Sequence, residues 1–424
     1  MTPSLNPSVM QRYSRPIFII GVLFFVFGFV TWLGAVLIPY LRIACELNNL
    51  SSYLVTFSFY ISYTVMAIPS AALLRRTGYK KGMALGLLIM AVGALLFIPA
   101  AGSRSYPLFL AGLFIQGTGL AIMQTAANPH VTILGPLESA AGRMSIMGIS
   151  NGIAGIIAPI IIGSVVLQDA DAIRSSITHL PAAQKVALLN TLLQRIVTPY
   201  LLIGIVLLIL ACWVFFSALP ELDTDPETDP QPGDTRSKTS IFQFPHLLFG
   251  VITLFLYVGV EVIAGDTIIN YGASQGIRLS TARFFSSCTL GNMLVGYVLG
   301  IVLIPKYLSQ TRALKFCAAM GVIFALAALS TRGLVSVAFI ALLGLANSLC
   351  WPSIWPLAIN GLGKFTPIGS SLLIVAIGGG ALLPLLYGWL ADHFTPQHAY
   401  WLVIPCYACI AWYAIAGHKI GRNL

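Results

Sequence analysis

Two carboxylates, Glu261 and Asp266, lie five residues apart in the otherwise apolar stretch LFLYVGVEVIAGDTIINYG (254–272). A charged side chain in hydrocarbon costs roughly 3 kcal/mol or more, so such residues usually mark an ion pathway or a binding site. No Lys or Arg falls in the middle of an apolar span, so neither acid has an evident basic partner there. An unpaired, desolvated carboxyl becomes neutral or binds a cation. Both acids are therefore candidates for coupling to a cation.

The helical period gives the two acids different positions. Five residues along a helix correspond to a rotation of about 140°, so the two cannot both face the centre of a bundle. We expect Glu261 to be the central group and Asp266 to lie nearer the outer mouth, where it shares a face with Asn270. The alternative role for Asp266 is a hydrogen bond between helices.

Amide side chains recur inside other apolar spans, and one of them lies a helical turn before a tryptophan. The residues are Gln124, Asn128, Asn151, Asn292, Asn347 and the ring of Trp351. Amides donate and accept hydrogen bonds, and a ring can stack on an apolar face, so this set could bind a ligand rich in hydroxyls. The alternative is a structural role, because an intramembrane amide often bridges two helices with about 1 kcal/mol. For Asn128, the following Pro129 strengthens that alternative.

The elements that must position these residues are membrane helices. The chain has 424 residues, of which 58% are hydrophobic and only 8% charged, and its mean hydropathy is +0.89. About a quarter of the residues of a soluble domain are charged, so this composition excludes an ordinary soluble protein. Repeated runs of about 20 apolar residues predict helices that span a bilayer.

Twelve spans are expected, arranged as two six-helix bundles in an all-α membrane protein. Residues 1–219 should form the N-terminal bundle and residues 244–424 the C-terminal one, with a Pro-rich, acidic cytoplasmic linker at 220–243. The amphipathic run at 182–196 predicts a short interfacial helix before the sixth span. The expected spans are 17–41, 53–74, 82–101, 106–132, 144–167, 197–219, 245–272, 284–304, 313–330, 334–360, 367–391 and 397–417.

The basic residues fit a topology in which both termini are cytoplasmic. With that orientation, fifteen of the 23 Lys and Arg residues lie on the cytoplasmic side. The net charge of +10 is thereby explained without a nucleic-acid partner. The bilayer is the expected partner surface, and we expect a monomer.

An internal repeat supports the division into halves. The pattern G-x3-P-x3-G occurs at Gly155, Pro159 and Gly163 in the fifth span, and again at Gly380, Pro384 and Gly388 in the eleventh. Small residues around a proline allow two helices to approach closely and to bend, which suits a mobile packing seam. A chance helix-packing pattern is the alternative. Parallel repeats of this kind build the major facilitator architecture, with its site near the membrane midplane.

Three segments carry a family resemblance: FGFVTWLGAVLIPYLRIACELNN (27–49), GTGLAIMQTAANPHVTILGP (117–136) and GSSLLIVAIGGGALLPLLYGWLAD (369–392). They resemble the fucose/galactose/glucose:proton symporter family of the major facilitator superfamily, over residues 18–416. The glucose/galactose and N-acetylglucosamine branch of bacterial inner-membrane permeases is the most similar. The resemblance implies the major facilitator fold, a location in the inner membrane and uptake of a hexose or amino-hexose by cation symport.

The chain departs from the fucose branch at two positions. Permeases of that branch carry an aspartate and a glutamate where this sequence has Ala35 and Gln124. Proton coupling through those two acids therefore does not carry over. Glu261 and Asp266 remain as candidates for coupling to a proton or a sodium ion, and Glu261 also for binding the sugar.

The segment RRTGYKK resembles the characteristic cytoplasmic loop of the superfamily between the second and third spans. A conformational latch would then comprise Arg75, Arg76, Gly78, Lys80 and Lys81. Such a latch pairs with helix ends and carboxylates that separate when the halves rock. Simple positive-inside topology is the alternative explanation for the basic residues.

Other activities have weaker support. The six histidines are scattered without metal-ligand spacing, so we expect no metal site, no catalytic residue and no enzyme acting on lipid-linked sugars. No G-x4-G-K-[ST] motif indicates a nucleotide-driven pump, and no cofactor is expected beyond the co-transported ion. A passive sugar uniporter and a multidrug exporter of the same fold remain the alternatives.

Overall fold

The computed structural model describes residues 7–133, 140–177, 179–217, 219, 240–304 and 307–421. Within them, twelve helical segments are long and apolar enough to cross a membrane. Their helical backbone satisfies the requirement that N–H and C=O groups in hydrocarbon be hydrogen-bonded within the segment. The all-α fold with twelve spans predicted from the sequence is confirmed.

The first six spans form what we call the N-terminal half. They are α1 (Pro7–Thr31), α2 (Gly34–Ala44), α3 (Asn49–Ser52), α4 (Leu54–Thr77), α5 (Tyr79–Leu95), α6 (Phe97–Ser103), α7 (Tyr106–Ile133), α8 (Ala140–Val166), α9 (Ala170–Ile177), α10 (Ala182–Gln194) and α11 (Val197–Phe216).

The last six spans form what we call the C-terminal half. Its elements are η3 (Ile241–Gln243), α12 (Pro245–Asp266), α13 (Ile268–Ser274), α14 (Leu279–Ala282), α15 (Phe285–Leu303), α16 (Gln310–Ser330), α17 (Gly333–Asn347), α18 (Cys350–Ile359), η4 (Gly363–Phe365), α19 (Thr366–Val375), η5 (Ala376–Gly378), α20 (Gly379–His393), η6 (His398–Leu402), α21 (Val403–Ile415) and η7 (Gly417–Lys419).

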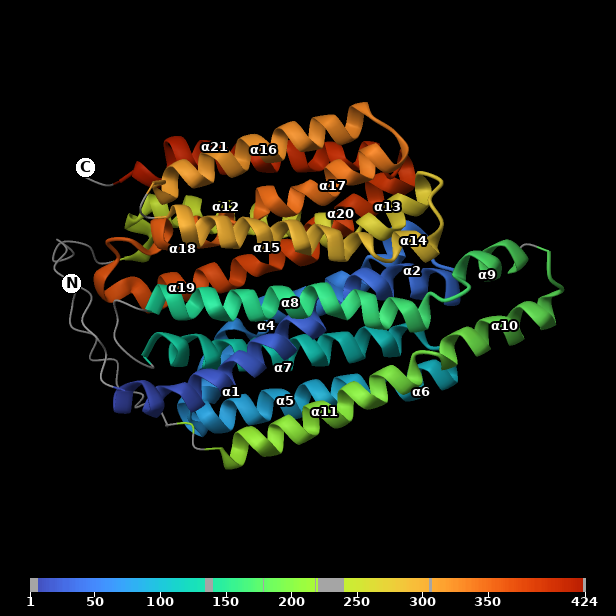
Figure 1. Ribbon diagram of the computed structural model, residues 1–424, viewed down its shortest axis with the longest axis horizontal. Coiled ribbons are helices and arrows are strands. Elements are labelled where there is room, and N and C mark those ends of the chain that lie inside the picture. The colour runs from blue at the N-terminus through green and yellow to red at the C-terminus, as the bar shows by residue number, and fades with distance from the viewer. Residues whose placement is uncertain are drawn as a thin grey trace.

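The two halves lie side by side along the long axis (Figure 1). The start of α1 and the end of α21 lie at one end of the molecule, whereas α9, α13 and α14 lie at the other, which we call the distal end. The halves pack on each other chiefly through α8 against α15 and α4 against α20. These pairs are the fifth span on the eighth and the second on the eleventh.

The span boundaries agree with the predicted ones to within a few residues, with one marked difference. The predicted helix at 182–196 forms as α10, but it continues into α11, so that the sixth span runs as one segment from Ala182 to Phe216. Figure 1 shows α9 and α10 extending beyond the bundle at the distal end. Most of the predicted linker, residues 220–239, lies outside the described residues.

The helices that carry the candidate residues are interrupted close to them. The predicted span 245–272 is split, because α12 ends at Asp266 and α13 begins at Ile268. Between them, the Thr267 hydroxyl bonds to the Ile263 carbonyl at 2.7 Å and to the Tyr400 hydroxyl at 2.6 Å, a side-chain bond that competes with the helix. Likewise α17 stops at Asn347, five residues before Pro352, which has no N–H to continue the ladder.

The glycine–proline repeat lies on the seam between the halves in both of its copies. In α8, an added Cβ at Gly155 would meet Leu290 of α15 at 3.2 Å, and one at Gly163 would meet the Arg283 side chain at 3.5 Å. In α20, the corresponding glycines face Tyr60 and Tyr53 of the other half. The prediction of a close packing seam is confirmed, whereas movement along it stays a prediction.

Candidate functional site

Trp32, at the junction of α1 and α2, contacts the opposite half. Its indole is 6% exposed and packs with Leu290 and Met293 of α15 in a small cluster of its own. Two glycines flank the ring: a Cβ added at Gly155 or at Gly265 would lie 2.5 Å from an indole carbon. Trp32 is therefore clamped between α8 of one half and α12 of the other.

Asn151 and Glu261 lie about one helical turn from Trp32, on the side away from the distal end. Asn151 is four residues before Gly155 in α8, and Glu261 is four residues before Gly265 in α12. Each therefore lies on the same helix face as its glycine, about 6 Å farther from the distal end. Both side chains are only partly buried. The amide of one half and the carboxylate of the other therefore lie at one level, beneath the indole of Trp32.

Hydroxyl and thiol groups of the C-terminal half lie near Glu261. Tyr257, one turn earlier on α12, makes a side-chain hydrogen bond with it. Tyr297 of α15 and Cys350 of α18 lie near enough to interact electrostatically with its charge. Among the described residues, no ion pair involves Glu261 or Asp266, in agreement with the lack of a basic partner in the sequence.

The two amides predicted in the C-terminal half contact neighbouring helices. The Asn292 side chain donates to the Ala341 carbonyl of α17 at 3.2 Å. The Tyr407 hydroxyl of α21 donates to Oδ1 of Asn347 at 2.9 Å, and Asn347 is 1% exposed with its Nδ2 unbonded. These contacts are of the interhelical kind that the sequence left as the alternative.

The remaining predicted residues lie in three places. Trp351, partly buried on α18, stacks on Trp355 with ring centroids 5.3 Å apart. Gln124 is partly buried on α7, which packs against α8 and so lies beside the helix of Asn151. Asn128 belongs to the same helix, but its side chain is outside the described residues.

Asp266 is separated from the Glu261 level by more than a helical turn, and it is 1% exposed. Its Oδ2 accepts a hydrogen bond from the Thr56 hydroxyl of α4 at 2.9 Å, while Oδ1 has no bonding partner. Thr56 belongs to the N-terminal half, so this bond crosses the seam. Asn270, predicted to share a face with Asp266, lies four residues later on α13, beyond the break, with its Nδ2 unbonded.

At the distal end, two aspartates bridge the halves in matching positions. Asp392, in the last turn of α20, accepts from the backbone N–H groups of Asn49 and Leu50 at 3.0 and 2.8 Å, and from the Asn49 amide at 2.7 Å. Asp171 follows α8 and accepts from the N–H groups of Leu279 and Ser280 at 2.8 and 3.1 Å. Each carboxylate thus caps the short helix that precedes the partner span of the other half.

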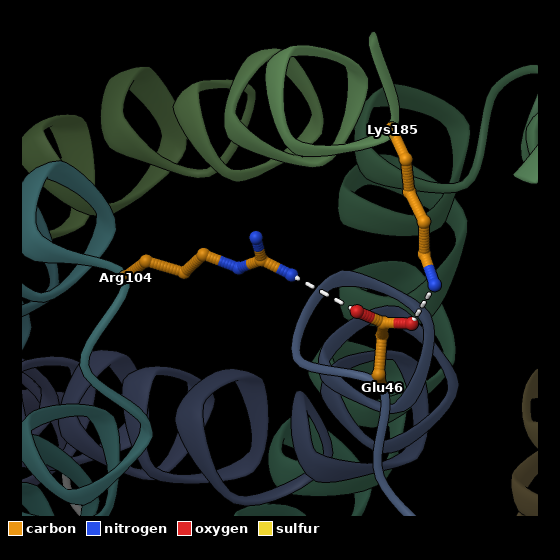
Figure 2. Close-up of polar contacts among 3 residues, drawn as sticks. All are labelled: Glu46, Arg104 and Lys185. Carbon is orange, nitrogen blue, oxygen red and sulfur yellow. Dashed lines mark ion pairs between the residues drawn. The ribbon is translucent and has the colours of Figure 1, made fainter. Parts of the chain in front are cut away.

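An ion-pair cluster at the same end lies within the N-terminal half. Glu46, after α2, pairs with Arg104 after α6 at 3.5 Å and with Lys185 of α10 (Figure 2). All three side chains are between a quarter and a half exposed, so the cluster adds little stability. It ties the extended α10 to the rest of its half.

The basic segment between α4 and α5 forms a very tight connection. α4 ends at Thr77 and α5 begins at Tyr79, with Gly78 between them at φ +77°, a conformation that favours glycine. Lys80 donates to the Ser217 carbonyl at 2.6 Å, where its charge lies at the carboxyl end of α11. Arg75, Arg76 and Lys81 are exposed. Their role as a latch stays a prediction.

Sequence reasoning missed Trp32, Thr56, Asp171 and Asp392, which all join the halves. A tryptophan in an apolar span is typical of helix packing, and no periodicity distinguishes such a residue from a clamp. The aspartates offered a usable signal, because each follows one copy of the glycine–proline repeat. Only the fold reveals that the partners are the starts of α14 and α3.

Comparisons with known proteins agree with this geometry. A family model described as Major Facilitator Superfamily matches residues 20–367. A glucose/galactose transporter of Brucella abortus is 34% identical, over 98% of this chain and 98% of that protein. An L-fucose-proton symporter of Escherichia coli is 30% identical, over 90% of this chain and 88% of that protein.

Solved structures match over nearly the whole length. The transporter FucP in the outward conformation has a TM-score of 0.72 and 28% identity, covering 97% of this chain and 100% of that one. A D-xylose-proton symporter has a TM-score of 0.70 at 15% identity, covering 96% and 99% of the two chains. The second likeness concerns the fold alone.

Proposed function

The chain belongs to the major facilitator superfamily, and we propose that it imports a hexose or amino-hexose together with a monovalent cation. The sugar is of the glucose, galactose or N-acetylglucosamine class, and the cation is a proton or a sodium ion. The names of its relatives, a glucose/galactose transporter and an L-fucose-proton symporter, support this class of substrate and the coupling. Transport proceeds by alternating access, as the halves rock around a central site.

The level formed by Asn151 and Glu261 beneath Trp32 is the observation that carries this proposal. A sugar hydroxyl both donates and accepts, so an amide and a carboxylate from opposite halves can bind one ring together. Such a ligand interacts with both halves at once, and it can therefore favour particular arrangements of them. Trp32 lies on the distal side of this level and would separate the bound sugar from that end.

Further side chains complete the proposed site. Gln124 and Asn128 of α7 are assigned to the N-terminal wall, and Asn292, Asn347 and Trp351 to the C-terminal wall. Asn292 and Asn347 each use one amide atom to hold a neighbouring helix, which fixes their orientation. The unbonded Nδ2 of Asn347 is then the atom available to a ligand.

The two intramembrane acids are the candidate groups for the coupling. Glu261 and Asp266 both lack a basic partner among the described ion pairs, so either can change its state with a cation. Sugar and cation must favour the same conformations, which is a reciprocal free energy between their sites. No cofactor beyond the co-transported ion is required.

The chain is a multi-pass membrane protein. We place it in the inner membrane as a monomer, with both termini cytoplasmic, so that the distal end faces outward. Arg75, Arg76, Gly78, Lys80 and Lys81 then lie on the cytoplasmic side, where the exposed basic residues can pair with the opposite half when the halves close there. This placement follows the excess of basic residues in the segments assigned to that side.

Uptake into proteoliposomes tests the proposal. Labelled glucose, galactose, N-acetylglucosamine and fucose are offered to the purified protein with an inward proton gradient, an inward sodium gradient or neither. We expect one of the first three sugars to accumulate under one of the gradients, and Glu261→Gln to transport it far more slowly. Equilibration of a sugar regardless of gradient would instead identify a passive uniporter. Transport of none of the sugars would contradict the proposal.

A further inference from the structure

A small cavity lies beside Asp266, and nearly all of its lining belongs to the opposite half. Its volume is about 10 Å³, enough for one water molecule. Thr31, Gly34, Thr56, Tyr60 and Tyr200 are among the lining residues from the N-terminal half, whereas Asp266 is the lining residue from the C-terminal half. The carboxyl group of α12 therefore inserts into the interior of its partner half.

The oxygen atoms around this cavity are incompletely bonded. Oδ1 of Asp266 and the hydroxyl of Tyr200 are both buried without a hydrogen-bond partner, whereas Oδ2 of Asp266 is held by Thr56. An unpaired buried carboxylate oxygen is costly, because water has been removed and nothing replaces it. A proton on Oδ1, or a cation against it, removes that cost.

The described lining of the cavity supplies no fixed positive charge. None of the described residues that line the cavity is a Lys, Arg or His. The titratable groups facing Asp266 are the phenols of Tyr53 and Tyr60, at or on α4, and of Tyr200 on α11. Glu261 also interacts with Tyr60, and the charges of Arg42 and Asp392 reach Tyr53. Each phenol is neutral near pH 7, so a cation must come from solution.

Resting on the proposed symport, we propose that the coupling cation binds at Oδ1 of Asp266, between the halves, and that Glu261 serves the sugar. With the cation bound, the Asp266 carboxyl can accept the hydrogen bond from Thr56 across the seam, and the distal end closes. Without it, a bare carboxylate would have to be buried in a cavity that offers one hydroxyl bond, and closure is opposed. If the ion is a proton, the carboxylate takes it up at Oδ1 and releases it when the halves separate.

Asp266→Asn separates the two roles, because an amide has the shape of the carboxyl group but carries no negative charge to attract a cation and takes up no proton near neutral pH. We expect this variant to exchange labelled for unlabelled sugar across proteoliposomes at within about threefold of the unaltered rate. Under a tenfold cation gradient, one-for-one coupling supports accumulation of up to about tenfold, and the variant should reach a ratio of only one. Continued accumulation by Asp266→Asn, or loss of its sugar exchange, would overturn the assignment.

A second readout does not depend on transport. In detergent solution, binding of sugar raises the Tm of the purified protein, and linkage makes that rise depend on the coupling cation. We expect the dependence on pH or on sodium to vanish in Asp266→Asn and to persist in Glu261→Gln at a sugar concentration high enough to bind. A dependence unchanged in Asp266→Asn would overturn the proposal.

Thr56→Val tests the site with the carboxyl left in place. The Thr56 hydroxyl donates to the carboxylate and so favours its charged form. Its loss should lower the proton concentration needed for half-maximal uptake by about tenfold, or raise the sodium concentration by a similar factor. Thr64→Val is the matched control, since Thr64 also bridges the halves from α4, to the Val375 carbonyl at 3.2 Å. Equal effects of the two valines would overturn the assignment.

These outcomes are distinct from a failure of the proposed function. If the unaltered protein moves no sugar, or never concentrates it, symport itself is wrong. If it concentrates sugar and Asp266→Asn does so too, symport stands and only the cation site is wrong.

Discussion

The carboxylate of Asp392, at the end of the eleventh span, accepts hydrogen bonds from both the backbone and the side-chain amide of Asn49, at 3.0 and 2.7 Å. Asn49 starts α3, just before the second span in the other half. Asp171 and Leu279 make the equivalent contact between the fifth and eighth spans, at 2.8 Å. The two repeats of the fold thus close the distal end with the same device, a carboxylate that caps a helix across the seam.

Removing the Asp392 cap should open the distal end. Loss of a helix cap costs about 0.5–2 kcal/mol, which corresponds to a roughly 2- to 30-fold change in an equilibrium. We expect Asp392→Ala to increase the distal-open population by such a factor. Spin labels at Ser103 and Phe394, exposed positions at the distal ends of the two halves, would report a longer distance. An unchanged distance distribution would show that the cap does not hold the halves.

The Asp171 cap should be insensitive to pH over the physiological range. Burial raises the pKa of Asp171, but the hydrogen bonds from the N–H groups of Leu279 and Ser280 outweigh it, so the pKa lies below its ordinary value of 3.8. A depressed pKa means that the carboxylate stabilises the closed state above the ordinary value and loses this effect only as pH falls through the lowered one. Between pH 5 and 8 its contribution is constant.

Asp171→Asn should therefore favour the distal-open state by the same factor at pH 5 and at pH 8. The shape of the pH profile for sugar uptake should not change. Asp169→Asn is the matched control, because Asp169 pairs with Arg195 of its own half at 3.9 Å and crosses no seam. A flattened pH profile in Asp171→Asn would mean that this group, and not an intramembrane acid, carries the pH dependence.

The packing of Trp32 between Gly155 and Gly265 can be tested by a rescue experiment. An alanine at Gly265 would place its Cβ 2.5 Å from the indole, so the closed arrangement must distort by an amount that commonly costs about 1–3 kcal/mol. We expect Gly265→Ala to slow sugar exchange at least fivefold and Trp32→Leu to restore it in the double variant. Gly291→Ala serves as a control, since a Cβ there meets nothing within 4 Å. Additive losses in the double variant would argue against the clamp.

Variants of the hydrogen-bonded pair Tyr407 and Asn347 can distinguish a role of Asn347 in sugar binding from a role in stability. Tyr407→Phe leaves the buried Oδ1 of Asn347 without its donor, which should destabilise the protein by about 1–3 kcal/mol. Adding Asn347→Leu removes both partners and should recover much of the Tm. If Asn347 also binds sugar, the double variant stays weak in sugar affinity despite its recovered stability. Recovery of both would make Asn347 purely structural.

Sequence patterns predicted most of this architecture. Apolar runs located the twelve spans, and the repeat at Gly155 and Gly380 indicated the seam, because both signals depend on local composition. The break after Asp266 was missed, since it depends on Thr267 bonding to Tyr400, a residue 133 positions away. Contacts of that range are set by the fold and leave no local trace.

The candidate site was predictable in kind but not in layout. Polar residues in apolar spans stand out, so Glu261, Asp266 and Asn151 could be selected from the sequence. Their division into two levels, one below Trp32 and one beside Thr56, required knowing which helices face each other across the seam. The structure also gives Asn292 and Asn347 interhelical contacts, which a count of intramembrane amides cannot distinguish from ligand-binding positions.

The most direct test of the account is the steady-state accumulation of labelled sugar by the unaltered protein against an imposed cation gradient. Proteoliposomes are held at zero membrane potential, and proton and sodium gradients are varied separately. The account predicts that the ratio of internal to external sugar rises with one of the two gradients, up to about tenfold for a tenfold gradient and one-for-one coupling. A ratio that stays at one under both gradients would contradict it and make the protein a passive carrier.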